Sequence, residues 1–293
     1  MAEDLDEDLL RSDDDTELMD PLSFNIPSST SKYITDNKLN KFFKFDDKSA
    51  LNVMHVNCRS LKQNFGALTN LLNQLTSNIS VIALTETWPS ESLQDVYNIP
   101  GYNFISNHRI GKTGGGVGLF LNNQFEYRHR FDLCRMCDFI ECVFIEIQRA
   151  SLQPVFVGSI YRPPNTDISL FIAELQSILT IIDNTCKKIA IIAGDFNLNL
   201  LKHSSHTQTG DFLNILLSYN YMPTIGQPTR ITELSATLID NIFIHSEKLD
   251  YNSAIVYNDI SDHLPIAIHL MCGVTKVKRQ KSLTKRSFDA ISI

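Results

Sequence analysis

The chain has 293 residues, of which 43% are hydrophobic, which is enough to bury the core of one large domain. No apolar run approaches about 18 residues, and no charged-then-apolar leader follows Met1, so the composition argues against a membrane span and a signal peptide. The six cysteines are too sparse for a disulfide scaffold, and we expect reduced thiols in a nuclear or cytoplasmic protein. Cys134 and Cys137 have a zinc-like spacing, but no second pair matches them.

The net charge of −7 is distributed unevenly along the chain. Residues 1–20 carry ten acids and one arginine, a balance of −9, whereas residues 276–286 carry six Lys and Arg and no acid, a balance of +6. The remaining body, residues 21–275, has 22 acids and 19 bases, a balance of −3. The body therefore lacks the strongly basic face typical of nucleic-acid-binding proteins, although a metal cation can supply positive charge where a phosphate sits.

The texture of the sequence predicts one folded domain between two polar tails. Residues 1–48 are acidic, rich in Ser and Asp, and lack periodic apolar positions, so we expect them to be disordered. Residues 49–271 alternate between apolar strands and amphipathic helices and are expected to form the domain. Residues 272–293 are expected to be a basic tail.

Apolar periodicity predicts the elements of this domain. In chain order, strands are expected at residues 51–57, 79–85, 115–121, 139–147, 154–161, 187–194, 237–244 and 264–270. Helices are expected at residues 61–75, 170–182 and 210–220, where apolar residues recur at helical spacing. Ile- and Val-rich strands with few helices between them predict an α/β fold, with helices covering the sheets and some strands pairing antiparallel.

Polar residues mark the ends of the predicted strands. They are Asn57, Glu86, Tyr161 with Arg162, Asp195 with Asn197, and Asp262 with His263. Each one alone fits a cap or turn, because Asp and Asn favour both, and Asp262–His263 also fits a buried core pair. The complementary chemistry of the whole set indicates a site instead. Asp240 is the most informative, since it is predicted in mid-strand, where an unpaired carboxylate is costly to bury.

The residue types favour metal-dependent phosphodiester hydrolysis. Mg²⁺ takes oxygen ligands from one or two carboxylates, waters and a substrate phosphate, whereas zinc prefers nitrogen and sulfur. The chain has neither the elbow motif of serine hydrolases nor the glycine loop of nucleotide-binding P-loops. The glycines of TGGGVGLF, residues 113–120, lead into a predicted strand rather than a helix, so we interpret them as a turn with close strand packing.

Seven short motifs in a fixed order resemble a known family. HVNCRSL, IALTETW, GGGVGLFL, YRPPN, IIAGDFN, SATLIDNIF and SDHLPI are similar to the endonuclease domain of non-long-terminal-repeat (LINE-type, jockey-like) retrotransposons, a branch of the endonuclease/exonuclease/phosphatase superfamily. The resemblance covers about residues 50–270. It implies a DNase I-like α/β fold, a four-layer sandwich of two mixed β-sheets flanked by helices. It also implies an enzyme that nicks DNA to expose a 3′-hydroxyl for reverse transcription, with Mg²⁺ as cofactor and Mn²⁺ as a substitute.

The resemblance assigns a metal site to three residues. Glu86 is implied as the principal metal ligand, Asn57 as its support, and Asp262 as a group near the metal that helps to orient the site. Three arginines near the strand ends, Arg59, Arg109 and Arg162, are candidate DNA contacts.

The remaining roles are catalytic. Asp195, with Asn197 beside it, is implied to orient or deprotonate the attacking water, while Tyr161 and His263 contact the phosphate. Asp240 is implied to pair with His263 and to fix its orientation. The same resemblance leads us to expect DNA as the partner, no membrane, no small-molecule cofactor and a monomer.

The chain also departs from the family pattern. Pro89 follows Trp88 where leucine is more usual, and no polymerase motif of the YxDD type is present, so the basic tail resembles a truncated linker toward a reverse transcriptase. Two alternatives stay open. One is another phosphoesterase of the same fold, acting on lipid or inositol phosphates, and the other is a catalytically silent remnant of a mobile element.

Overall fold

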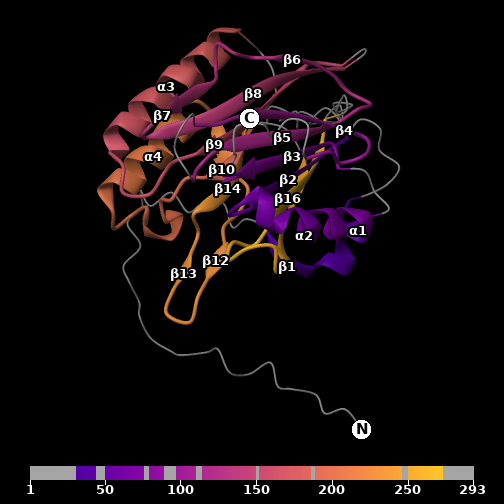
Figure 1. Cartoon of the computed structure of the whole chain (residues 1–293). Coiled ribbons are helices and arrows are strands. Elements are labelled where there is room, and N and C mark those ends of the chain that lie inside the picture. The colour runs from indigo at the N-terminus through magenta and orange to yellow at the C-terminus, as the bar shows by residue number, and fades with distance from the viewer. Residues whose placement is uncertain are drawn as a thin grey trace, which may run out of the picture.

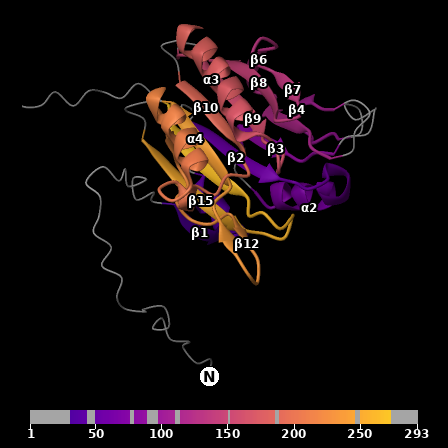
Figure 2. The same ribbon diagram turned by 90° about the vertical axis from the view of Figure 1, so that its left-hand side faces the viewer.

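The computed structural model describes residues 31–43, 50–75, 79–88, 97–109, 114–149, 152–185, 189–245 and 250–272. Within these residues, two mixed β-sheets face each other and each carries helices on its outer side (Figures 1 and 2). Alternating strands and helices in the sequence thus give the expected four-layer α/β sandwich, in which both sheets are covered. No helix in the described ranges has the length and hydropathy needed to cross a bilayer.

The first sheet, called sheet A here, has the strand order β1-β15-β16-β2-β3-β5-β4. The β1–β15 and β2–β3 pairs are parallel and the other neighbours are antiparallel. Its strands are β1 (Lys32–Thr35), β2 (Ala50–Asn57), β3 (Val81–Thr85), β4 (Tyr102–Asn107), β5 (Val117–Asn122), β15 (Tyr251–Tyr257) and β16 (Ile266–Met271).

The second sheet, sheet B, has the order β11-β14-β10-β9-β8-β6, and β7 also pairs with β8. Only the β9–β10 pair is parallel among these neighbours. Its strands are β6 (Glu126–His129), β7 (Arg135–Cys137), β8 (Ile140–Gln148), β9 (Val155–Tyr161), β10 (Ile189–Asp195), β11 (Tyr221–Pro223) and β14 (Asp240–His245). A two-stranded hairpin of β12 (Arg230–Ile231) and β13 (Ala236–Thr237) projects from the body (Figure 1).

The helices form the outer layers. On sheet A lie α1 (Leu39–Phe42) and α2 (Leu61–Asn73), and on sheet B lie α3 (Ile168–Thr185) and α4 (Thr207–Ser218), with short 3-10 turns at Asp36–Lys38 and Leu200–Lys202. The helix α3 begins where the Asp167 carboxylate accepts the backbone N–H groups of Ser169 (2.8 Å) and Leu170 (3.1 Å), as an N-cap residue does. Its buried side chains recur every three to four residues, which turns one face toward the sheet: Phe171, Leu175, Ile178, Leu179 and Ile182.

The expectation that residues 1–48 are disordered is wrong for residues 31–43. In this range β1 pairs with β15, Leu39 and Phe43 are fully buried, and the Tyr33 hydroxyl donates to the Pro228 carbonyl at 2.8 Å. The segment is ordered by contacts with residues about 200 positions away, so its own periodicity carries no signal. Residues 1–30 and the basic tail from residue 273 onward lie outside the described ranges.

Two other details differ from the sequence prediction. Strands β1, β4, β6, β7, β11, β12, β13 and β15 were not predicted, and most are short, with partly exposed residues that break the apolar pattern. The predicted strand at 237–244 begins at Asp240, so this carboxylate starts β14 instead of lying in mid-strand.

Candidate active site

Four polar residues of sheet B stand side by side in register. The pairing places Glu141 opposite Tyr161, Tyr161 opposite Asp195, and Asp195 opposite Asp240. Paired residues on adjacent strands lie about 5 Å apart and point to the same face of the sheet. Three carboxylates and one phenol therefore form a row across four strands.

Sheet A supplies the opposing side of the site. Along β2, Leu51 and Val53 belong to the core between the sheets, whereas Met54 and Val56 pack toward α2. By the two-residue period of a strand, His55 and Asn57 share the face of Val53, which is directed at sheet B. The contacts of both residues with carboxylates of sheet B agree with this direction.

Asn57 joins the two sheets at the site. Its side-chain N–H₂ donates to Glu86 Oε1 and to Asp195 Oδ2, both at 2.9 Å. Glu86 follows β3 of sheet A, and Asp195 ends β10 of sheet B. The loop before β16 is tied to the same residue, because the Ser261 hydroxyl donates to the Asn57 carbonyl at 2.6 Å.

Backbone strain gathers around this junction. Glu86, Trp88, Arg59, Ser60 and Asn197 all have positive φ values, of 52°, 46°, 38°, 84° and 48°. Residues with a Cβ adopt this region rarely, at a cost of about 1–3 kcal/mol each, and such residues cluster at functional sites. The Ser60 N–H donates to the Glu86 carbonyl at 2.9 Å, so the strained turns support each other.

The glycine motif supports the turn that carries Glu86. The N–H of Trp88 donates to the Gly115 carbonyl at 2.9 Å, and that of Thr87 donates to the Gly116 carbonyl at 3.3 Å. The Gly116 N–H in turn donates to the buried carboxylate of Glu141. At Gly115 φ is +68°, and a Cβ there would lie 2.5 Å from Glu141 Oε1, so only glycine fits. The expected turn with close packing is present at these glycines.

Asp195 is fully buried among polar groups. Burial, followed by the charge of Asp240, raises its pKa to about 8, against a partial lowering by His263. The Asn197 backbone N–H donates to Oδ1 at 2.9 Å, and its side-chain N–H₂ donates to Oδ2 at 3.3 Å. The two asparagines, Asn57 and Asn197, therefore fix the carboxylate on both of its oxygens.

Asp240 and His263 form a buried pair. Nδ1 of His263 donates to Asp240 Oδ2 at 2.9 Å, and the Thr229 hydroxyl donates to the same oxygen at 2.7 Å. Burial disfavours the charged imidazole, but the Asp240 charge outweighs burial and raises the pKa of His263 to about 9. Burial likewise opposes the charge of Asp240, but His263 and then His55 hold the pKa of this carboxyl well below its usual range.

Tyr161 lies between two carboxylates of the row and is largely buried. Burial and the charges of Glu86 and Asp195 raise the pKa of its phenol. The hydroxyl therefore stays protonated and can donate a hydrogen bond.

Three side chains converge where a metal ion could bind. Glu86, Asp195 and His263 each offer one ligand atom, and these atoms lie within 4.8 Å of one another. The two carboxylates suit a hard divalent cation that keeps waters and a phosphate in its remaining positions, whereas the charged ring of His263 has no lone pair for a metal and lies beside the carboxylates as a donor. No other such group of His, Cys, Asp and Glu occurs in the described ranges, and Cys134 and Cys137 are therefore not part of one.

Asp262 stands apart from this group. Its carboxylate forms an ion pair with Arg59 Nη1 at 2.9 Å and accepts from Arg230 Nη2 at 2.6 Å. The structure thus places Asp262 between two cations next to His263, rather than among the candidate metal ligands.

The three arginines expected to contact DNA differ in their surroundings. The side chain of Arg59 is 52% exposed, and Arg109 forms an ion pair with Glu141. Arg162 is only 4% exposed, and its guanidinium donates to the carbonyls of Phe196 (2.7 Å) and Asn197 (2.8 Å). The expectation for Arg162 is wrong, because its donors are used to hold the loop after β10.

Sequence reasoning missed three residues of the site: Glu141, His55 and Arg230. Glu141 interrupts the apolar strand predicted at residues 139–147 as Asp240 interrupts the one predicted at residues 237–244, so the same argument would have found it. His55 shares a strand face with Asn57, which the two-residue period predicts. Arg230 lies in the β12–β13 hairpin and reaches Asp262 through tertiary contact, for which the sequence holds no signal.

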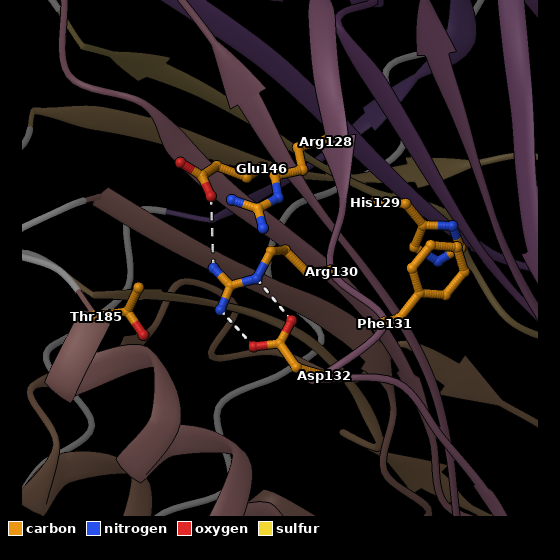
Figure 3. A pocket seen from close by; sticks show the side chains of 7 residues that line it. All are labelled: Arg128, His129, Arg130, Phe131, Asp132, Glu146 and Thr185. Atoms are coloured by element: carbon orange, nitrogen blue, oxygen red, sulfur yellow. Dashed lines mark hydrogen bonds and ion pairs between the residues drawn. The ribbon is translucent and has the colours of Figure 1, made fainter.

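A separate cavity lies on sheet B, toward the end of β8 remote from Glu141 (Figure 3). Its lining residues are Arg128, His129, Arg130, Phe131, Asp132, Glu146 and Thr185. The Arg130 guanidinium in it is occupied by Asp132 (2.6 Å) and Glu146 (3.4 Å), and the rings of His129 and Phe131 stack at 3.9 Å. The charges of this cavity largely neutralise each other, and none of its residues belongs to the group described above.

Known proteins resemble the chain in sequence over part of its length and in fold. A family model described as endonuclease-reverse transcriptase matches residues 155–267, and a search of curated protein sequences gives no match. Among solved structures, the endonuclease domain of TRAS1, a telomere-specific non-LTR retrotransposon, is 13% identical with a TM-score of 0.58, over 76% of this chain and 99% of that chain.

Two further structures share the fold. The Xenopus laevis APE2 catalytic domain is 17% identical with a TM-score of 0.58, over 76% of this chain and 92% of that chain. D. rerio TDP2 complexed with single strand DNA product is 16% identical with a TM-score of 0.56, over 76% of this chain and 99% of that chain. The chain thus shares its fold with these three structures, and its residues 155–267 are similar to the endonuclease-reverse transcriptase family.

Proposed function

We propose that the chain is a Mg²⁺-dependent endonuclease that nicks DNA, and that the exposed 3′-hydroxyl serves as a primer for reverse transcription. One observation carries the proposal: Glu86, Asp195 and His263 converge to within 4.8 Å, and Asn57 hydrogen-bonds both carboxylates. This arrangement combines a cation site with an acid–base group, as phosphodiester hydrolysis requires. The family match to an endonuclease-reverse transcriptase supports DNA as the substrate class.

Asp195 is the proposed general base. Its raised pKa, about 8, lies near neutral pH, where a carboxylate can accept a proton from an attacking water. Asn57 and Asn197 hold both of its oxygens, so the base is oriented before substrate binds. This orientation avoids reorganisation during the reaction.

His263 and Tyr161 are the proposed phosphate contacts. Because Asp240 occupies Nδ1 of His263, the Nε2–H of the charged ring remains to donate to a phosphate oxygen. The phenol of Tyr161 stays protonated and supplies a second donor. Positive charge and hydrogen-bond donors stabilise the negative charge that develops on the phosphoryl group.

Glu86 is the proposed principal ligand of Mg²⁺, with Asp195 and His263 close to the same position. Asn57 and the Trp88 indole N–H (3.2 Å) fix one Glu86 oxygen each. When bound, Mg²⁺ supplies neutralisation of the phosphoryl charge, and Mn²⁺ can take its place among oxygen ligands. Arg59 and Arg230, which are partly exposed beside His263, are proposed contacts of the DNA backbone.

Incubation with supercoiled plasmid tests the proposal. The protein is expected to convert the plasmid to open circles with Mg²⁺ and to leave it intact with chelator. Glu86→Gln should abolish nicking, whereas Glu174→Gln, which alters an ion pair with Arg135 at another place, should keep it. Equal nicking by the Glu86→Gln protein contradicts the proposal. Hydrolysis of inositol or sugar phosphates in place of DNA would identify the other phosphoesterase class.

A further inference from the structure

The carboxylate of Asp240 contacts two histidines, and only one of them faces the proposed phosphate position. His263 donates to it from the loop before β16, and His55 contacts it from β2 with Nε2 at 3.3 Å from Oδ1. We propose that His55 is a positioning residue, which fixes the Asp240 carboxylate and thereby the ring of His263. The inference rests on the proposed function, in which His263 contacts the scissile phosphate.

The contacts of Asp240 leave its carboxylate no freedom to turn. Oδ2 accepts from Thr229 at 2.7 Å and from His263 at 2.9 Å, while Oδ1 lies 3.1 Å from His263 and 3.3 Å from His55. An ionised carboxylate is acceptor-only and offers about four lone-pair positions. Without His55, Oδ1 would contact only Nδ1 of His263, which also contacts Oδ2. The carboxylate could then rotate while keeping its hydrogen bond to Thr229.

The chemistry of the carboxylate sets the tautomer of His55. Because Asp240 only accepts, Nε2 of His55 must carry a proton to make this contact. Nδ1 of the same ring is buried and has no hydrogen-bond partner. Burial of an unpartnered ring nitrogen is unfavourable. The unfavourable arrangement indicates that His55 is present for its contact with Asp240.

The position of His55 couples this contact to both sheets. It pairs with Ile266 on β16, three residues after His263, whereas Asp240 lies on β14 of sheet B. His55 thus holds Asp240 relative to the strand that follows His263. A shift of either sheet would be transmitted to the hydrogen bond at Nδ1 of His263.

Two substitutions separate positioning from packing. His55→Leu keeps an apolar filler and removes the donor, and it is expected to lower kcat about tenfold with an unchanged KM, a typical effect of losing an outer-shell partner. His55→Gln places an amide N–H₂ near the Nε2 position and is expected to restore kcat to within about threefold of wild type. His269→Leu is the matched control, because His269 is another buried histidine of sheet A, with Nδ1 2.8 Å from Asn52 Oδ1. It should leave kcat unchanged. Normal kcat in His55→Leu, or no recovery in His55→Gln, overturns the proposal.

A measurement that needs no enzymatic turnover tests the contact between His55 and Asp240 separately from the proposed function. Ring ¹⁵N spectra of the full chain are expected to show His55 protonated at Nε2, and to show a shift of the His263 Nδ1–H signal in His55→Leu but not in His269→Leu. A protein that nicks no DNA yet gives these spectra contradicts the proposed function and retains the positioning contact. A His55 ring protonated only at Nδ1, or an unmoved His263 signal, contradicts the positioning role itself.

Discussion

Asp240 and His263 meet between the two sheets, with Oδ2 of the carboxylate 2.9 Å from Nδ1 of the ring. Asp240→Asn keeps the shape of this pair and removes its charge. We expect DNA nicking to fall about 100-fold or more, because the amide no longer selects the ring orientation or favours the charged imidazole. The apparent pKa of His263 should fall with it. Nicking rate and melting temperature, measured on one preparation, check this, and full activity would exclude the catalytic role.

The same pair gives stability a defined pH window. The pKa of His263 rises from 6.5 to about 9 on folding, so its contribution is complete below about 6.5 and is lost as the pH rises through 9. The pKa of Asp240 falls from 3.8, so its contribution is present above about 4 and is lost in acid. The difference in free energy of unfolding between wild type and Asp240→Asn should therefore shrink between pH 6 and pH 10. Urea unfolding at both values tests this, and a constant difference would show that His263 does not change charge there.

The buried carboxylate of Asp195 is expected to lower the stability of the folded state and to be required for nicking. Its pKa rises from 3.8 to about 8 on folding, so the folded state holds the proton more tightly and stability falls as the pH rises from about 4 to 8. Asp195→Asn removes this penalty. Without divalent cation at pH 8, we expect its melting temperature to exceed that of wild type by a few degrees, while nicking is lost. A lower melting temperature at pH 8 would mean that the carboxylate is needed for folding.

Gly115 should tolerate no side chain. Gly115→Ala adds a Cβ at a positive φ and 2.5 Å from Glu141 Oε1, whereas Gly101→Ala adds a Cβ at a φ of +87° in open space. We expect Gly101→Ala to cost about 1 kcal/mol and to leave nicking unchanged. Gly115→Ala should cost more and slow nicking, since it displaces the turn that carries Glu86. Equal unfolding free energies for the two variants would show that the loop yields to the added methyl group.

We propose residues 31–272, rather than 49–271, as the folding unit. A protein of residues 31–272 is expected to melt within a few degrees of the full chain. Removal of residues 31–48 deletes Leu39 and Phe43, both fully buried, and should lower the free energy of unfolding by several kcal/mol, at about 2–5 kcal/mol for each large buried side chain lost. Chemical denaturation of the protein of residues 31–272 and of the same protein without residues 31–48 tests this expectation. Equal denaturation midpoints would show that the core is complete without β1 and α1.

Apolar runs predicted the central strands because the burial of these strands follows the local periodicity of apolar residues in the sequence. The seven buried residues of β9 and the mixed face of β2 are examples. Edge strands such as β1 were not predicted from the sequence. β1 depends on its pairing with β15, and its first and last residues, Lys32 and Thr35, are exposed. Strand-end polarity located Asn57, Glu86 and Asp195, which the fold brings into contact.

Other relations at the site are purely tertiary. Nothing in the sequence relates Arg230 to Asp262, or shows that Arg162 turns its guanidinium inward toward backbone carbonyls. Both facts depend on where a loop folds back, and loop paths are set by contacts that sequence spacing does not encode.

The residues of the site come from distant parts of the chain and are therefore synthesised at different times. Asn57 and Glu86 come early in the chain, Asp195 more than 100 residues later, and His263 later still, in the loop before the final described strand β16. A ribosome-bound chain that has not yet released residue 263 has no complete constellation, however well its first strands have folded. In refolding of the full chain, His263 reaches the site only when β16 pairs with β2, so nicking should lag behind secondary structure and rise together with this pairing.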